Sequence, residues 1–153
     1  MKKYIILLLV LCLAIIIFTA CKTIPDPEEI DKDLTPAELF QLAQEEVIER
    51  NNYKAAMVYY QTFLQRYPDD MQGQVIAEYE IAFLYHKMGE EETAIKLFEA
   101  LLDKYEGPNA DVLPRWPEVL SRKVLSLIRE EMEEQGGQGQ EQEQEPAETE
   151  TEA

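Results

Sequence analysis

The chain has 153 residues, of which 46% are hydrophobic and 29% charged, and its formal net charge is −17. A single domain of ordinary size fits this length. The excess of carboxylates argues against nucleic-acid binding, which needs clustered Lys and Arg opposite the phosphates, and against adhesion to anionic lipid through protein charge. We therefore expect partners that are neutral, apolar or basic, and no nucleic acid.

Residues 1–20 are typical of a secretory signal peptide. Two lysines precede an apolar run over residues 4–18, and the small residues Thr19 and Ala20 follow it. The run is about fifteen residues long, which is shorter than the roughly 20 that a helix needs to cross the hydrocarbon core. An uncleaved membrane anchor is the alternative interpretation.

The triplet Thr19-Ala20-Cys21 resembles the lipobox of bacterial lipoproteins. The resemblance implies cleavage before Cys21 and attachment of lipid, such as palmitate, to this new N-terminus. Lys22 stands where Asp retains Gram-negative lipoproteins in the inner membrane, which favours the outer membrane, facing the periplasm. Residues 21–34 are rich in prolines and acids and are expected to form an extended, solvated tether. Cys12 would be removed with the signal peptide, so no thiol would be left for a disulfide or a metal site.

A first pair of helices is predicted after the tether. The stretch Thr35-Pro36-Ala37-Glu38 begins the first helix, because threonine caps, proline suits the first helical position and the glutamate completes a capping box. This helix should end near Asn51-Asn52, since these amides can close one helix and cap the next. The second helix covers residues 52–67 and stops at Pro68, which cannot donate the next hydrogen bond.

A second pair is expected after a spacer over residues 71–74. Its first helix should run from about Gly73 to Met88, with Gly89 as a left-handed cap. Its second helix should run over residues 90–105, where an acidic first turn complements the helix dipole.

The two pairs repeat one pattern. In the second pair Ala94 takes the place of Ala56, and an aromatic residue again follows four positions later. Helix–turn–helix units of about 34 residues with such a pattern resemble tetratricopeptide repeats. The resemblance implies an all-α fold, a short α-solenoid of two helix pairs, with repeats at about 37–70 and 75–108.

A fifth helix over residues 117–134 is predicted to cap the repeats and to complete a domain over residues 35–134. We expect Trp116 to pack ahead of this helix rather than to bind a ligand. Residues 135–153 are acidic and of low complexity, and are predicted to be a disordered tail. The positions expected to point inward on the fifth helix are Leu120, Val124, Leu127 or Ile128, and Met132.

The sequence offers no catalytic constellation. His86 is the only histidine, and Ser121 and Ser126 lack a nucleophile motif. Adjacent carboxylates such as those of residues 90–92 lie on predicted exposed helical faces, where neighbours do not converge. We therefore expect no enzyme activity, no cofactor and no metal site.

In tetratricopeptide units the first helix of each pair lines a concave binding face, so the resemblance implies a site on this chain. The site would be acidic on the first helix and aromatic on the third, and would fit an extended or helical peptide with basic and apolar side chains. The alternative is that Tyr79 and Phe83 only pack against the fifth helix. The predicted partner-binding residues are Glu38, Gln41, Glu45, Ile48, Glu49, Ile76, Tyr79, Phe83, His86 and Lys87.

The lipobox followed by residues 36–105 resembles BamD-type outer-membrane assembly lipoproteins and YbgF-like periplasmic repeat proteins, through the NNYKAA turn and the RYPDD stop. This resemblance implies a lipid-anchored periplasmic scaffold or adaptor, accessory to outer-membrane protein assembly or to envelope organisation. A repeat lipoprotein that binds a small ligand and serves a transporter is the alternative. Envelope structure through self-association is a third hypothesis.

Overall fold

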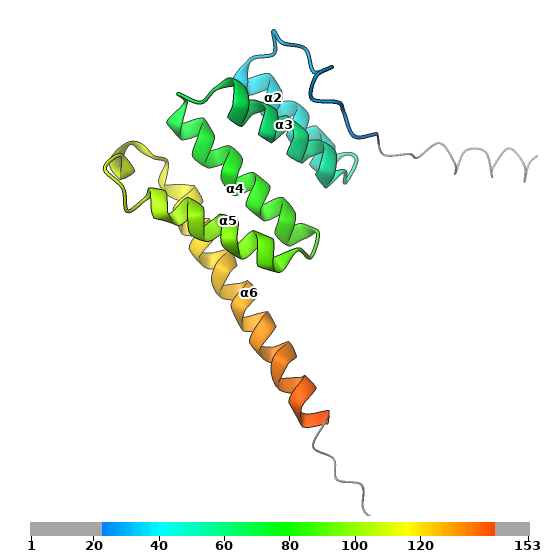
Figure 1. Ribbon diagram of the computed structural model, residues 1–153, viewed down its shortest axis with the longest axis vertical. Helices are drawn as coiled ribbons and strands as arrows, with labels where there is room; N and C mark the ends of the chain where they lie inside the picture. The colour runs from blue at the N-terminus through cyan, green and yellow to red at the C-terminus, as the bar shows by residue number, and fades with distance from the viewer. Residues whose placement is uncertain (1–22, 143–153) are drawn as a thin grey trace, which may run out of the picture. The chain divides into compact units, whose positions relative to one another are not determined.

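The computed structural model describes the backbone of residues 23–142 and the side chains of residues 23–134. The predicted signal peptide and Cys21 lie outside the described residues, and so does the end of the predicted tail. Within the described range the chain is helical and has no strand, which confirms the all-α class (Figure 1). No helix of this range is both long and apolar enough to cross a bilayer. The elements are α2 (Pro36–Ile48), α3 (Tyr53–Arg66), α4 (Met71–Lys87), α5 (Glu91–Lys104), the 3-10 helix η1 (Ala110–Val112) and α6 (Arg115–Gln142).

The chain divides into two compact units, Met1–Thr62 and Phe63–Ala153, with the division inside α3. In the first unit α2 begins with the predicted capping box. The Thr35 hydroxyl accepts from the Glu38 N–H at 3.4 Å, and the Glu38 carboxylate accepts from the Thr35 N–H at 2.8 Å. This exchange satisfies backbone donors that a helix start leaves unpaired, and so fixes where α2 begins.

The turn between α2 and α3 is built by two asparagines, as predicted. Asn51 has a left-handed backbone with φ of 49°, and the Asn52 side chain accepts from the Ala55 N–H at 3.4 Å. The Asn52 amide also donates to the carbonyl of Thr23 at 3.2 Å. This hydrogen bond and the burial of Ile30 show that part of the predicted tether packs on the domain. The expectation of an extended, solvated tether was wrong for this part of the segment, because Ile30 provides an apolar anchor.

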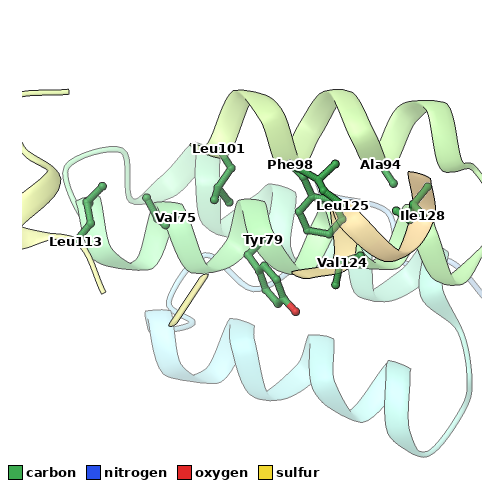
Figure 2. Packing of buried hydrophobic residues seen from close by; sticks show 10 residues of the cluster. Val75, Tyr79, Ala94, Phe98, Leu101, Leu113, Val124, Leu125 and Ile128 are labelled. Carbon is green, nitrogen blue, oxygen red and sulfur yellow. The ribbon is translucent and has the colours of Figure 1, made fainter. Parts of the chain in front are cut away.

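In the second unit, side chains from α4, α5 and α6 point toward one another and form one core (Figure 2). Ala82 and Ala94 are completely buried, so their small side chains let the helices approach closely. The Phe98 ring, also completely buried, fills the space between them. The core residues are Val75, Tyr79, Ala82, Ala94, Phe98, Leu101, Leu113, Val124, Leu125 and Ile128.

Polar side chains fix the start of α4, which lies at Met71 rather than at Gly73. Asp70 caps the helix by accepting from the Gly73 N–H at 2.9 Å. The Gln74 amide donates to the carbonyls of Leu64 and Tyr67 at 2.9 and 3.0 Å, and so satisfies acceptors at the end of α3. The residues between the repeats therefore form the first turn of α4.

The end of α4 follows the prediction. Gly89 has φ of 77°, a left-handed conformation that glycine adopts without strain. The N–H of Glu90 then reaches back to the carbonyl of Tyr85 at 3.0 Å. This pairing closes α4 and lets α5 begin after a short turn.

The capping helix α6 extends beyond its predicted range at both ends. It begins at Arg115, because Pro117 in the first turn has no need to donate a hydrogen bond. It ends at Gln142, past the predicted end at Glu134, so the segment predicted as disordered is helical up to that residue. Figure 1 shows this end of α6 projecting away from α4 and α5.

The predicted inward face of α6 was partly wrong. Ile128 and Val124 are buried as expected, but the buried stripe also includes Pro117, Ser121 and Leu125. Leu120, Leu127 and Met132 are instead exposed.

Candidate protein-binding surface

The predicted residues of α2 share one solvent-facing side. Their spacing of three, four and seven positions places them on one helical face, opposite the fully buried Leu39 and Ala43. Ile48 is the one large apolar residue of this set, and 79% of its surface is exposed. The five residues, Glu38, Gln41, Glu45, Ile48 and Glu49, are called the α2 face below.

Carboxylates set the charge of the α2 face. The Gln41 amide donates to the Glu45 carboxylate at 2.9 Å, which orders both side chains along the helix. Hydrogen bonds from the Thr35 hydroxyl and N–H lower the pKa of Glu38, so this group stays ionised while it caps the helix. The α2 face therefore presents negative charge beside an apolar residue, a combination that suits basic and apolar partner groups.

On α4 the predicted residues form an aromatic row, but Tyr79 belongs to the core. Its ring stacks on Phe83 at 6.0 Å between centroids and also contacts Phe98 and the edge of Trp116, at 5.9 and 5.1 Å. Only 7% of Tyr79 is exposed, and burial raises its pKa to about 12. The prediction that Tyr79 lies on an open binding face was therefore wrong, because the capping helix covers its side chain.

Phe83 and its neighbours remain partly accessible at the end of α4. The Lys87 ammonium lies 5.9 Å from the centre of the Phe83 ring, within range of a cation–π contact. His86 points its Nδ1 at the Glu91 carboxylate, 2.9 Å away, so it links α4 to the start of α5. Ile76, seven positions before Phe83 on the same helix, is partly buried. The α4 contribution thus consists of Phe83 and Lys87, flanked by the contact between His86 and Glu91.

Comparison with known proteins accounts for the two helix pairs. The model of the family described as Tetratricopeptide repeat matches residues 39–70 and 77–107. The chain contains two tetratricopeptide repeats. The first repeat comprises α2 and α3, the second comprises α4 and α5, and the predicted boundaries differ from the matched ones by a few residues.

A relative is found in Treponema pallidum (strain Nichols), a protein described as uncharacterized. It is 32% identical over 102 residues, which cover 67% of this chain but only 40% of the relative. No solved structure matches the chain. The repeats are therefore the part of the chain that a known family explains.

α6 carries exposed apolar residues that were not predicted as part of a site. Trp116 touches Tyr79 through its ring edge, yet 41% of its surface is exposed. Leu120 and Leu127 lie on the same side of the helix. The apolar arc of α6 is wider than α4 and α5 can cover, and this width is visible in the sequence as apolar residues at 116, 120 and 127 beside those at 117, 124 and 128.

The second unit also contains small cavities. One of about 330 Å³ lies between the start of α4 and the loop after α5, with Met71, Val75 and Leu113 among its walls. Lys104 at its edge is already paired with Glu78 at 2.5 Å. No cluster of metal-ligating side chains occurs within the described part of the chain.

Proposed function

We propose that the chain is a lipid-anchored adaptor that binds a protein of the bacterial cell envelope through the first helices of its repeats. The tetratricopeptide repeats support the part of this proposal that concerns protein binding, because such repeats serve as protein-interaction scaffolds. The observation that carries the proposal is the α2 face, where carboxylates that no core packing requires surround the exposed side chain of Ile48.

The chemistry of the partner follows from these residues. A basic, partly apolar peptide could pair its cations with Glu45 and Glu49 while an apolar side chain covers Ile48. On α4, Phe83 offers an aromatic surface and Lys87 a single positive charge. The strong overall negative charge would speed the approach of a basic partner.

The lipid anchor is proposed from the sequence triplet that ends in Cys21. Cells that express the full chain and grow on labelled palmitate should incorporate label into the wild type and into Cys12→Ser, but not into Cys21→Ser. Fractionation of the labelled membranes would then test the proposed outer-membrane position against the inner membrane. Label retained in Cys21→Ser would overturn the anchor.

The partner can be sought where the protein acts. A photo-crosslinker at position 41, on the α2 face, should attach the full-length chain to one envelope protein in its own membrane. Glu45→Lys with Glu49→Lys should abolish this product, because the two carboxylates proposed to bind the partner's cations then become cations themselves. The control, Glu92→Lys with Glu106→Lys, changes the net charge equally at exposed sites of the second unit and should leave the product intact. An equal loss in both variants would contradict the site.

A ligand carrier that serves a transporter is the second candidate, and the cavity beside Met71 and Val75 favours it. Its volume of about 330 Å³ is at the lower end of the range for small-molecule sites, roughly 300 to 1,000 Å³. Native mass spectrometry of the protein released from its membrane distinguishes the two functions. A small molecule that stays bound would support the carrier, whereas a protein complex without one would support the adaptor.

A further inference from the structure

The two halves of α6 carry opposite charges. The first half, up to residue 129, has a single carboxylate, Glu118, and several cations. The second half begins at Glu130 and contains acidic residues without any basic one. Two copies of such a helix repel when they lie parallel and attract when they lie antiparallel. The charged residues with described side chains are Arg115, Glu118, Arg122, Lys123, Arg129, Glu130, Glu131, Glu133 and Glu134.

An uncovered apolar stripe runs along the same helix. Trp116, Leu120 and Leu127 are spaced by four and seven positions, so they project from one side of α6. They are exposed by 41%, 38% and 45%. Lys123 lies between the two leucines on this side, and its aliphatic stem can cover apolar surface while its ammonium stays in water. These four residues are called the α6 face.

The opposite side of α6 is already occupied. Ser121 and Ile128 are fully or almost fully buried in the core shared with α4 and α5. The Arg129 side chain is also engaged, since it donates to Glu99 of α5 at 2.6 Å. Apart from the ring-edge contact of Trp116 with Tyr79, the α6 face is therefore an additional surface beside the one that holds the capping helix in place.

We propose that the α6 face binds the α6 face of a second copy of this chain, with the two helices antiparallel. In this arrangement Trp116 of one copy packs near Leu127 of the other. Arg115 of each copy then lies close to Glu130 and Glu131 of the facing helix, and the stem of Lys123 lies over Leu120. A parallel pair would instead place cations against cations and carboxylates against carboxylates.

A single helix pair gives a small interface. It buries less than the roughly 800 Å² per partner of standard stable interfaces, so we expect a dissociation constant on the order of micromolar. The net charge of −17 opposes association of any two copies. Local charge complementarity along α6 is what makes this one orientation favourable. The inference concerns self-association and stands independently of the envelope partner proposed above.

Sedimentation velocity of the full-length chain in a non-ionic detergent tests the association. The wild type should convert from monomer to dimer as the concentration rises. Leu127→Glu should raise the dissociation constant at least about tenfold, since it buries an unpaired charge beside the partner's tryptophan. Met71→Glu is the matched control, because Met71 is 46% exposed but lies outside α6, and it should dimerise like the wild type. Equal melting temperatures would show that the variants are folded.

Charge exchange tests the complementarity. Arg115→Glu reverses the charge at the start of α6, and Glu130→Lys with Glu131→Lys reverses the charges that face it on the other copy. Each variant alone should dimerise more weakly than the wild type. An equal mixture of the two should form the heterodimer, because position 115 of each chain then again faces opposite charges at positions 130 and 131 of the other.

A photo-crosslinker in place of Trp116 tests the orientation. It should attach to residues near Leu127 of the second copy, and attachment near residue 116 of that copy would show a parallel pair and overturn the proposal. A wild type that stays monomeric at all concentrations would also overturn it, as would a Leu127→Glu variant that dimerises normally. If the crosslinker captures only another envelope protein or lipid, the α6 face belongs to that partner instead.

Discussion

Gly73 sits at a point where the end of one repeat packs on the start of the next helix. A Cβ built on this glycine would lie 2.4 Å from the Phe63 ring and 2.7 Å from the Asp70 carboxylate. Phe63 is completely buried and Asp70 caps α4, so neither can move without loss. The position therefore excludes any side chain, although a helix interior ordinarily favours alanine over glycine.

We predict that Gly73→Ala destabilises the protein by about 1 to 3 kcal/mol, as overpacking does. Helix propensity alone predicts the opposite sign, a gain of about 1 kcal/mol. Chemical denaturation monitored by circular dichroism measures the difference. Gly107→Ala is the control, because its Cβ would meet only the Lys104 carbonyl at 3.3 Å, and its effect should be small. A stabilised Gly73→Ala would show that Phe63 can repack.

Glu80 of α4 is a carboxyl group whose pKa is raised by burial. The folded state therefore binds its proton more tightly than the unfolded state does. As the pH rises from below the unfolded pKa through the folded one, ionisation of this group progressively lowers the stability of the folded state. Glu80→Gln removes the charge and should raise the melting temperature at pH 7.

The gain from Glu80→Gln should shrink as the pH approaches 4, because the wild-type carboxyl is then protonated in both states. Glu92→Gln, at an exposed position of α5, is the control for the loss of one carboxylate. Melting curves across this pH range check the sign. A lower melting temperature for Glu80→Gln at pH 7 would mean that the carboxylate is stabilised by a partner rather than penalised by burial.

The helices show which features a sequence can predict. Caps and stops depend on a few adjacent residues, so Thr35, Asn51 and Gly89 allowed the turns to be predicted correctly. The face that a helix buries depends on its neighbours, which a single sequence does not show. The apolar arc of α6 includes Leu120 and Leu127 as well as the buried residues, and periodicity alone could not tell which part α4 and α5 cover. For the same reason the sequence left open whether Tyr79 faces a partner or packs against the fifth helix, and the structure shows the second.

The orientation of α6 in the second unit can be tested with two adjacent residues. Ile128 is almost fully buried, so Ile128→Ala should cost about 2 to 4 kcal/mol of unfolding free energy through lost contacts and a cavity. Leu127→Ala, next to it on the exposed flank, should cost less than about 1 kcal/mol. Both are best measured at concentrations low enough to keep the chain monomeric. Equal costs would place the buried stripe elsewhere.

At the scale of the whole molecule, each compact unit provides a first helix that the repeat family would use for binding. Within its own unit, α2 presents an acidic face. On α4, Tyr79 is buried, whereas Phe83 is partly accessible and Lys87 is exposed. The aromatic part of the predicted site is therefore smaller than the sequence suggested, because the capping helix takes part of it. The residues of the acidic part stay exposed or partly exposed on α2, which supports the proposal that charge governs the choice of partner.

The same charge limits stability. With a net charge of −17, the folded chain holds many carboxylates closer together than the unfolded chain does, and their repulsion favours unfolding. Raising NaCl from about 20 mM to about 200 mM shortens the screening length to below roughly 10 Å and should raise the melting temperature. The exposed ion pairs, such as Arg122 with Glu118, contribute too little to reverse this trend.

The variant Glu92→Lys with Glu106→Lys lowers the negative charge without touching the core, so its melting temperature should be higher at low salt and should rise less as salt is added. Thermal unfolding of both chains across the salt series provides the comparison. If the wild type were instead destabilised by salt, specific ion pairs would outweigh the general repulsion. In that case local ion pairs within the fold would account for the carboxylates of the α2 face. Their presence would then no longer support a basic partner.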